Sequence, residues 1–434
     1  MILKLYRHRG KIWKQKFQSI KAISPQLKQL VKDMQETLEL TSGVGLAAPQ
    51  IGQPLRLFIV DYGELKETFI NPKIIKREKE ADEVEEGCLS VPGVRGLVSR
   101  STGIEIDYID IHGKKKRAIL AGYYARIVQH EYDHLSSTFY TSHIVDKNKL
   151  YTYKPIKIVY FGTSEFAVPI LKTLYGQQFV GEVEIPLVIT APDAPAGRGK
   201  TSTSSLVKLI ATEFNLNIDT PASLKGNKKF VSKLKSLNPD FIVLASYGKI
   251  IPKEILEVPK KGSINVHPSI LPKYRGPSPI GSAILAGDKS TGVTIIKMNE
   301  KMDEGDILGT ARIRISTKDT AQSLSKKLAD LSSKFILHIL HLAHLEKIKA
   351  KPQNHKLATY TKIIRKEDGL INWKKPPQNL ELIIRAYYPW PGVWTKYNGK
   401  ILKLLPGNKL QLEGKNPVTV KEFKAGHKDF TLNW

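Results

Sequence analysis

The sequence has a single cysteine among its 434 residues, and it offers no long apolar run. Because Cys88 has no second cysteine to pair with, a disulfide framework within the chain is excluded, and a reducing compartment is expected. No apolar stretch approaches the roughly 20 residues that cross a bilayer, and residues 1–4 lack the apolar core of a secretory signal. We therefore expect a cytoplasmic protein with no membrane partner.

Acidic residues are also scarce relative to basic ones. Lysine and arginine total 68 against 41 aspartates and glutamates, which gives a formal net charge of +27. One interpretation is an ordinary surface of solvated lysines, and the other is a polyanionic partner, which so large an excess favours. The length is enough for roughly two to four domains with sizeable cores.

A short apolar run about a third of the way along the chain divides it. Residues 156–161 are largely apolar and stop at Gly162, and a helix-like segment follows. This pattern is typical of a buried parallel strand that enters its first strand-to-helix turn. We therefore predict a first domain at 1–150, a second at 154–349, and a linker with a small C-terminal domain at 350–434.

The first domain has the pattern of an α+β fold. Apolar residues at helical spacing predict a helix over 27–40, and strands are expected at 57–60, 69–70 and 104–107. A second helix is predicted over 126–135. Strands that precede one helix, rather than alternating with helices, favour this class.

The second predicted helix carries the motif HEYDH at residues 130–134. Histidines four residues apart lie on one helical face and can bind one metal ion, and Glu131 beside them can exchange a proton with water at that metal. Because a bare HExxH pattern also arises by chance, a third ligand decides the matter. Cys88 is either a small buried apolar residue or that ligand, and two imidazoles with one thiolate leave a fourth tetrahedral position open.

Three segments in this order resemble the signature motifs of the peptide deformylase family: GVGLAAPQ at 43–50, EGCLS at 86–90 and QHEYDHL at 129–135. The resemblance implies a metal held by Cys88, His130 and His134, with Glu131 as general acid and base. Family members favour Fe²⁺, although Zn²⁺ and Ni²⁺ suit the same ligands. The implied substrates are nascent N-formylmethionyl peptides, with the ribosome as one setting for the encounter.

The same resemblance implies further roles for residues near the metal. Gln50 and the backbone N–H of Leu89 would hold the oxyanion, and Gly45 would contact the substrate. Hydrolysis of a formyl amide needs such donors aimed at the developing negative oxygen. The sequence departs from the family at Ser137, where glycine is usual, and the C-terminal helix of many members has no counterpart before the second domain begins.

In the second domain, strand-like and helix-like runs alternate. Strands are predicted at 156–161, 186–190, 241–245, 263–266 and 293–298, with helices such as 166–175 and 205–214 between them. This pattern predicts a doubly wound, Rossmann-like parallel sheet with ligands at the carboxyl ends of its strands. The segment that begins at Gly162 has one glycine, whereas a dinucleotide-binding fingerprint needs three. Residues 199–201 match the end of a phosphate-binding loop, but Ala194 stands where the first glycine of that loop is required, so nucleotide hydrolysis is not expected.

A group of polar residues lies at the end of one predicted strand. Asn265 and His267 alternate, so they point to the same side of an extended segment. An amide beside an imidazole offers an oxyanion donor next to an acid or base. Asp303, which follows another predicted strand, is either the partner that orients His267 or an ordinary turn residue, and the whole group is open to interpretation as a strand-end turn.

The segments NVHPSILP at 265–272 and DEGD at 303–306 resemble the formyltransferases that use 10-formyltetrahydrofolate. The resemblance implies a catalytic trio and names 10-formyltetrahydrofolate as the co-substrate. The acceptor amine attacks the formyl carbon, Asn265 donates to the oxyanion, and the pair of His267 and Asp303 moves the proton. This acyl transfer needs no metal.

Three features are similar to the methionyl-tRNA formyltransferases in particular: KYRGPSPI at 273–280, the loop PDAPAGRGK at 192–200, and a third domain. The implied partner is initiator methionyl-tRNA, and Arg198 and Lys200 in the loop are suited to contact its phosphates. The alternative interpretation of the loop is a flexible solvated turn, which has the same composition. Further contacts with substrate or tRNA are implied at Ser269, Leu271, Pro272, Tyr274 and Arg275.

The C-terminal part is small and basic. Residues 386–392, AYYPWPG, match the entry to that family's C-terminal barrel, and turn signals such as Asn398-Gly399 follow. Residues 351–434 hold 16 lysines and arginines against 6 acidic residues. We predict a β-barrel of the oligonucleotide-binding (OB) type, shorter than usual, that binds tRNA.

The combined prediction is a bifunctional enzyme of translation initiation. One half formylates initiator methionyl-tRNA, and the other hydrolyses the formyl group from N-formylmethionyl peptides. One alternative acceptor is a small-molecule amine, such as a sugar nucleotide or glycinamide ribotide, against which the basic C-terminal part argues. A second alternative makes one half a non-catalytic tRNA- or ribosome-binding module, whose mark would be a lost catalytic residue.

Overall fold

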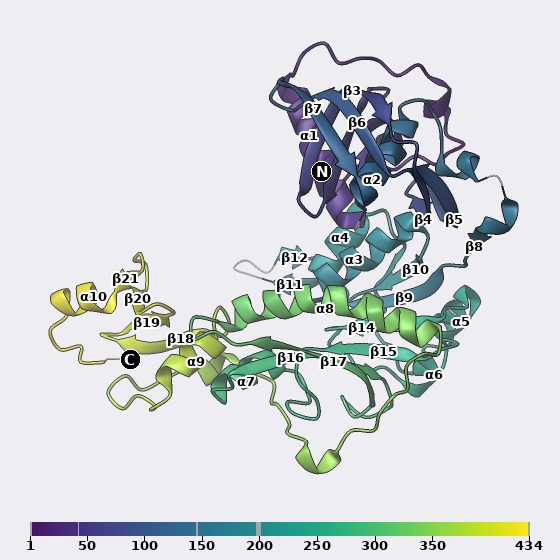
Figure 1. The fold of residues 1–434 in the computed structure, drawn as a ribbon. Coiled ribbons are helices and arrows are strands. Elements are labelled where there is room, and N and C mark those ends of the chain that lie inside the picture. Colours follow the sequence, from purple (N-terminus) through teal and green to yellow (C-terminus); the bar gives the residue numbers. More distant parts are fainter. Residues whose placement is uncertain (1, 42, 145, 197–200, 433–434) are drawn as a thin grey trace. The chain divides into compact units, whose positions relative to one another are not determined.

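The computed structural model describes residues 2–41, 43–144, 146–196 and 201–432 (Figure 1). These residues form two compact units. The first unit holds residues 1–156 and 172–184, and the second holds residues 157–171 and 185–434. In the described part of the chain, no helix combines the length and the apolar character needed to cross a membrane.

The first unit contains the helix that apolar spacing predicts. Helix α1 spans Pro25–Thr41 and begins with a proline, which has the φ of a helical residue and no N–H to leave unpaired. It buries Leu27, Val31, Met34 and Leu38, whose spacing of three or four residues places them on one face. The hydrophobic core of this unit therefore follows directly from the sequence pattern.

Two antiparallel sheets accompany α1. Within the described residues, the larger sheet has the strand order β1-β2-β3-β6-β7 and the smaller has the order β4-β5-β8. The strands of the larger sheet are β1 (Gly45–Ala47), β2 (Leu57–Tyr62), β3 (Leu65–Arg77), β6 (Gly103–Ile109) and β7 (Lys115–Ala121). Those of the smaller sheet are β4 (Ala81–Cys88), β5 (Val91–Ser101) and β8 (Leu150–Thr152). Strands β4 and β7 escaped prediction because they are rich in charge and largely exposed.

Helix α2 (Gly122–His134) begins four residues before the predicted start, and its end explains the unusual Ser137. Ser137 has a φ of 57°, in the left-handed region that favours glycine. Its hydroxyl donates to the Trp13 carbonyl at 2.8 Å, and its N–H donates to the His134 carbonyl at 3.2 Å. Serine therefore accepts backbone strain here and gains a hydrogen bond that glycine cannot make.

The second unit is built on a sheet with the order β13-β10-β9-β14-β15-β16-β17, counted over the residues that the structure describes. Pairings β10–β13, β9–β14 and β14–β15 are parallel, in agreement with the doubly wound prediction. Pairings β15–β16 and β16–β17 are antiparallel, so the prediction that residues 293–298 join a wholly parallel sheet is wrong. The chain leaves β15 and enters β16 at the same edge of the sheet, without the crossover that a parallel strand needs.

The strands of this sheet are β9 (Ile156–Gly162), β10 (Val183–Ile189), β13 (Ile218–Asp219), β14 (Phe241–Ala245), β15 (Ser263–His267), β16 (Ser290–Lys297) and β17 (Asp306–Arg314). The helices along this part of the chain are α3 (Ala167–Val180), α4 (Leu206–Glu213), α5 (Lys228–Leu237), α6 (Lys253–Leu256), α7 (Pro279–Leu285) and α8 (Ala321–His344). Every residue of β14 and β15 is buried, as expected for central strands covered on both faces. Helix α8 packs against β16 and β17 (Figure 1).

The chain ends in a small antiparallel sheet with the order β18-β19-β20-β21. Its elements are α9 (Leu380–Ala386), β18 (Val393–Tyr397), β19 (Lys400–Leu405), β20 (Lys409–Leu412), β21 (Val418–Thr419) and α10 (Val420–Gly426). The predicted turn at Asn398-Gly399 joins β18 to β19, and both residues have positive φ, as this tight hairpin requires. Leu402, Leu410 and Phe430 belong to the core beneath the sheet.

We expect Ser137→Ala to lower the free energy of unfolding of the first unit by about 1 kcal/mol, because alanine keeps the left-handed strain and loses the hydrogen bond to Trp13. Ser137→Gly should melt at a higher temperature than the alanine variant, since glycine accepts this φ without a Cβ penalty. Scanning calorimetry of the full chain measures both. Equal melting temperatures for the two variants would contradict the strained conformation.

Candidate active sites

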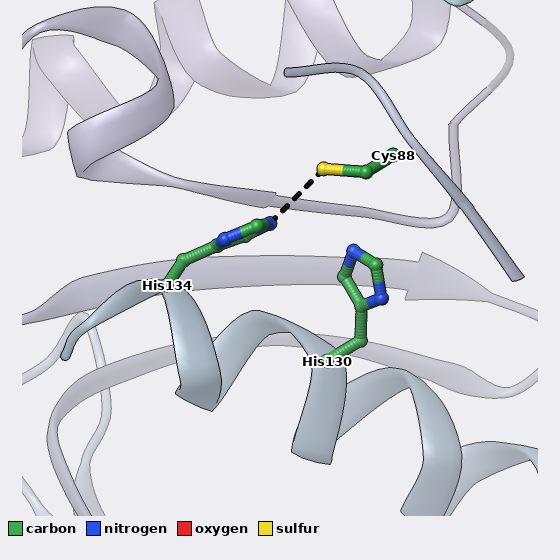
Figure 2. A group of neighbouring side chains, drawn as sticks. All are labelled: Cys88, His130 and His134. Carbon is green, nitrogen blue, oxygen red and sulfur yellow. Dashed lines mark hydrogen bonds between the residues drawn. The ribbon is translucent and has the colours of Figure 1, made fainter. Parts of the chain in front are cut away.

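Helix α2 presents polar side chains to the end of strand β4. His130, Glu131 and His134 lie within the last two turns of α2, and Cys88 is the last residue of β4. One ligand atom from each of Cys88, His130 and His134 lies within 4.8 Å of the other two. Figure 2 shows both imidazoles rising from the helix toward the Cys88 sulfur, and His134 Nε2 is 3.3 Å from that sulfur. The helical spacing places the two histidines on one face of α2, and the end of β4 brings Cys88 to them.

A buried carboxylate fixes the orientation of the His130 ring. Glu86 Oε2 is 2.9 Å from His130 Nδ1, which leaves Nε2 for the side of the ring that faces Cys88. Two guanidinium groups neutralise this carboxylate: Arg100 Nε donates to it at 2.6 Å and Arg126 Nη1 at 2.7 Å. Burial by itself would raise the pKa of Glu86, but its hydrogen bonds with His130 and Arg100 hold that pKa far below its usual range.

The Cys88 sulfur is surrounded by groups that stabilise a thiolate. Ser90 N–H lies 3.4 Å from it, and Gln50 Nε2 donates to it at 3.6 Å. The amide of Gln50 is oriented because its Oε1 accepts from the Ala47 N–H at 2.8 Å. Burial opposes ionisation, yet the charge of His134 and the neighbouring His130 lower the pKa of Cys88 well below its ordinary value.

These residues fit a catalytic transition-metal site. A thiolate and two imidazoles are the donor set that borderline-soft divalent ions prefer. All three side chains are at least partly buried, and the second nitrogen of His130 has the carboxylate partner that such ligands normally have. The set supplies three ligands, so it is compatible with a fourth position open to water or substrate.

Glu131 is held close to this centre with capacity to accept a proton. Its side chain is 4% exposed, and its Oε2 has no hydrogen-bond partner among the described residues. Burial raises the pKa of Glu131 to about 7. A Cβ atom on Gly45 would lie 2.6 Å from Glu131 Oε1, so only glycine leaves room for the carboxylate.

Most of the site residues predicted for the first domain line a cavity of about 220 Å³. His134 is completely buried beside it. The lining includes Gly45, Gln50, Cys88, Leu89, His130 and Glu131. Two of the three predicted metal ligands, the predicted proton carrier and the predicted oxyanion donors therefore line one cavity.

The second predicted trio also comes together. Asn265 and His267 end strand β15, and Asp303 lies in the turn that follows β16. Asn265 Nδ2 donates to Asp303 Oδ1 at 3.1 Å, and His267 Nδ1 is 3.5 Å from the same oxygen. Gly276 N–H donates to the other carboxylate oxygen at 2.8 Å. Asp303 is thus a partner of His267 rather than an unconnected turn residue.

The loop after β15 surrounds this trio. The Tyr274 carbonyl lies 2.9 Å from His267 Nε2, so both ring nitrogens of His267 face oxygen atoms. The Ser269 hydroxyl donates to the Lys273 carbonyl at 2.7 Å, and the Leu271 N–H donates to the Thr294 hydroxyl at 3.1 Å. The Pro272 carbonyl accepts from the Thr359 N–H at 3.2 Å. These predicted substrate-contacting positions therefore also shape the loop.

Arg275, which the resemblance grouped with substrate and tRNA contacts, lies inside the protein. It is 1% exposed, and its guanidinium donates to Gln353 Oε1 at 2.7 Å and pairs with Glu304 at 3.1 Å. Gln353 was not singled out by sequence reasoning, because no motif marks an isolated glutamine in a linker. Arg198 and Lys200 lie outside the described residues; the short strands β11 (Ala194–Ala196) and β12 (Thr201–Thr203) on either side of them pair antiparallel.

Three protein-family models match successive parts of the chain. Residues 2–150 match the polypeptide deformylase model, residues 156–340 match the formyl transferase model, and residues 363–426 match the model of the formyl transferase C-terminal domain. A methionyl-tRNA formyltransferase from Caldanaerobacter subterraneus subsp. tengcongensis is 42% identical over 262 residues, which cover 60% of this chain and 84% of that protein.

The chain belongs to the methionyl-tRNA formyltransferase family. A second relative, the methionyl-tRNA formyltransferase from Thermodesulfovibrio yellowstonii, is 38% identical over 301 residues, covering 62% of this chain and 96% of that protein. In this member of the family, a polypeptide deformylase domain precedes the formyltransferase domains.

Two solved peptide deformylase structures are similar to part of this chain. That from Thermotoga maritima is 32% identical and the alignment covers 34% of this chain and 99% of that chain, with a TM-score of 0.33. That from Synechococcus elongatus in complex with actinonin is 32% identical, with coverage of 34% and 81% and a TM-score of 0.33. The deformylase assignment of this methionyl-tRNA formyltransferase family member rests on the family model rather than on these alignments.

We expect Gly45→Ala to push the Glu131 carboxylate out of place and to lower formate release from an N-formylmethionyl peptide on the order of 100-fold. Bound metal, measured by elemental analysis, should stay at the wild-type level, because the added Cβ meets Glu131 rather than a ligand. Cys88→Ser is the contrasting variant, which should lose metal together with activity. Full activity in Gly45→Ala would show that Glu131 need not occupy this position.

Proposed function

We propose that the chain is a bifunctional enzyme that works at both ends of the N-formylmethionine cycle. Its N-terminal half hydrolyses the formyl group from N-formylmethionyl peptides, and the remainder transfers formyl from 10-formyltetrahydrofolate to initiator methionyl-tRNA. The observation that carries the proposal is that two groups of side chains predicted to be catalytic each come together in one chain: Cys88 with His130 and His134, and Asp303 with Asn265 and His267. A non-catalytic module would not need either set.

In the deformylase half, Cys88, His130 and His134 hold the metal, for which Fe²⁺ is our proposal and Zn²⁺ and Ni²⁺ are the alternatives. When bound, the metal activates water at neutral pH and polarises the formyl carbonyl. Glu131 takes the proton from the attacking water and delivers it to the departing peptide amine.

The oxyanion of this reaction needs donors that are fixed before the substrate arrives. Gln50 lies in the cavity lining, and its Oε1 accepts from the Ala47 N–H. Its Nε2 carries two N–H bonds, so it can donate both to the Cys88 sulfur and, together with the Leu89 N–H, to the developing oxyanion. Gly45 keeps space for the Glu131 carboxylate, and its place in the cavity lining supports a contact with the substrate backbone.

In the transferase half, the amine of the methionyl group attacks the formyl carbon of 10-formyltetrahydrofolate. Asn265 Nδ2 donates to the oxygen as negative charge develops on it. The pair of His267 and Asp303 moves the proton that the attacking amine loses to the departing nitrogen of tetrahydrofolate. The bond between the formyl carbon and that nitrogen breaks as the nitrogen receives this proton, so the products are the formylated amine and tetrahydrofolate. Residues 269–272 follow the trio directly, which supports a role for Ser269, Leu271 and Pro272 in binding the folate or the acceptor.

For the remaining parts, we propose functional domains at 1–150, 154–349 and 350–434. The small sheet β18–β21 would belong to an OB-type barrel that binds the tRNA, supported by the net charge of this region and by the match to the C-terminal formyl transferase domain. Arg198, Lys200 and the Tyr274 side chain would add contacts near the acceptor end. Both substrates belong to translation, so we propose a cytoplasmic location and an encounter with nascent chains at the ribosome.

The transferase activity is tested with the deformylase half silenced by Glu131→Ala, so that product is not consumed. This protein, incubated with Met-charged initiator tRNA and 10-formyltetrahydrofolate, should form formyl-methionyl-tRNA. Adding Asn265→Ala should lower kcat by about 100- to 1,000-fold, because one oxyanion donor is lost, and adding His267→Ala should abolish the reaction. Folate binding without product would redirect the proposal to small-molecule amines as acceptors.

The two activities should be separable, because no residue is shared between the two catalytic sets. Glu131→Ala and treatment with a metal chelator should each stop formate release from an N-formylmethionyl peptide, while formylation of methionyl-tRNA continues at its full rate. Formate and formyl-methionyl-tRNA are measured on the same preparation. A parallel fall in formylation would mean that the halves depend on each other.

A further inference from the structure

A segment of the linker between α8 and the C-terminal domain lies against the loops of the transferase site. This latch segment, residues 353–361, falls between the parts of the chain that match the two formyl transferase models, 156–340 and 363–426. Its backbone pairs with the loop after β15: Arg275 N–H donates to the Thr359 carbonyl at 2.9 Å, and Thr361 N–H donates to the Arg275 carbonyl at 2.7 Å. The C-terminal end of the latch segment is therefore attached to the loop after β15 through its backbone.

Gln353 connects two loops through every polar atom of its amide. Its Nε2 donates to the Asp303 carbonyl at 2.8 Å and to the Gly305 carbonyl at 2.7 Å. Its Oε1 accepts from Arg275 Nη2 at 2.7 Å and from Arg275 Nε at 3.2 Å. Both donors and both lone pairs are used, so the amide has a single orientation, and it is 5% exposed. The backbone of the catalytic aspartate is therefore held by a residue of the linker.

Thr359 holds the other partner of the catalytic histidine. Its Oγ1 accepts from the Tyr274 N–H at 2.8 Å, and the Tyr274 carbonyl lies 2.9 Å from His267 Nε2. Tyr274 and Asp303 have φ values of 62° and 55°, in the left-handed region that costs L-residues on the order of 1 kcal/mol or more. Such conformations persist only where surrounding contacts fix them, and the latch segment supplies those contacts to both residues.

We propose that Gln353 and Thr359 are positioning residues for formyl transfer, which act by fixing the Asp303 turn and the Tyr274 carbonyl on the two sides of His267. The inference rests on the proposed transferase function. It assigns to the linker a part in catalysis that neither family model covers. Loss of either contact should loosen the geometry of the trio while leaving the substrate-binding surfaces in place.

The test compares matched variants in the Glu131→Ala background. Thr359→Val removes the hydroxyl that accepts from Tyr274 and keeps the shape and backbone bonds, whereas Thr359→Ser keeps the hydroxyl. Gln353→Glu keeps an oxygen toward Arg275 but loses the two donors to the carbonyls of Asp303 and Gly305. Asn354→Ala changes the exposed neighbour, whose side chain bonds only within the linker at Lys356 N–H, and serves as control.

We expect Thr359→Val and Gln353→Glu to lower kcat for formyl-methionyl-tRNA formation by about 10- to 100-fold. KM for each substrate should stay within about twofold of the parent value, and the melting temperature within roughly 3 °C. Thr359→Ser and Asn354→Ala should stay within about twofold of the parent. Either impaired variant keeping its kcat, or Thr359→Ser failing to restore it, overturns the positioning role of that residue. A loss seen only in KM or in melting temperature overturns it as well. Absence of product from the parent protein itself would instead refute the proposed transferase function.

Discussion

A carboxylate placed beside an imidazole is the interaction that both candidate active sites share. In the first unit Glu86 lies 2.9 Å from His130, and in the second Asp303 lies 3.5 Å from His267. Each carboxylate carries charge into a region with little water, so it needs partners other than the histidine. Two arginines supply them for Glu86, and Asn265 with a backbone N–H supplies them for Asp303.

The two sites differ in what keeps that pair in place. Glu86 and its arginines come from regular elements, β4, β5 and α2, whose own hydrogen bonds fix their geometry. Asp303 and Tyr274 come from loops with left-handed backbone, which secondary structure does not stabilise. In the second candidate site the contacts that hold these loops come from the linker, through Thr359 and Gln353, whereas in the first they come from regular secondary structure. Removing one member of the Glu86 cluster would leave buried charge uncompensated, at a cost of about 3–5 kcal/mol.

Much of the fold and of both candidate sites was predictable from sequence where local periodicity decides the geometry. The i, i+4 spacing of His130 and His134 places both rings on one face of α2, and the alternation of Asn265 and His267 turns both toward Asp303. The direction of β16 was not predictable in this way, because an apolar run has the same composition in a parallel and an antiparallel strand. The burial of Arg275 was not predictable either, because its partners lie far away in the sequence. No motif marks Gln353, so its contacts with two loops could not be predicted from the sequence.

The connection between the part of the chain that matches the deformylase model and the part that matches the formyl transferase model is short. Strand β8 pairs with β5 and ends at Thr152, and β9 begins at Ile156, so residues 153–155 connect the last strand of the deformylase match to the first strand of the formyl transferase match. Because one chain carries both catalytic sets, every molecule that can attach a formyl group also carries a domain of the polypeptide deformylase family. Coexistence of the two activities must then depend on discrimination within the deformylase cavity, between a methionyl ester of tRNA and a methionyl peptide, because this chain cannot be produced with one activity and without the other.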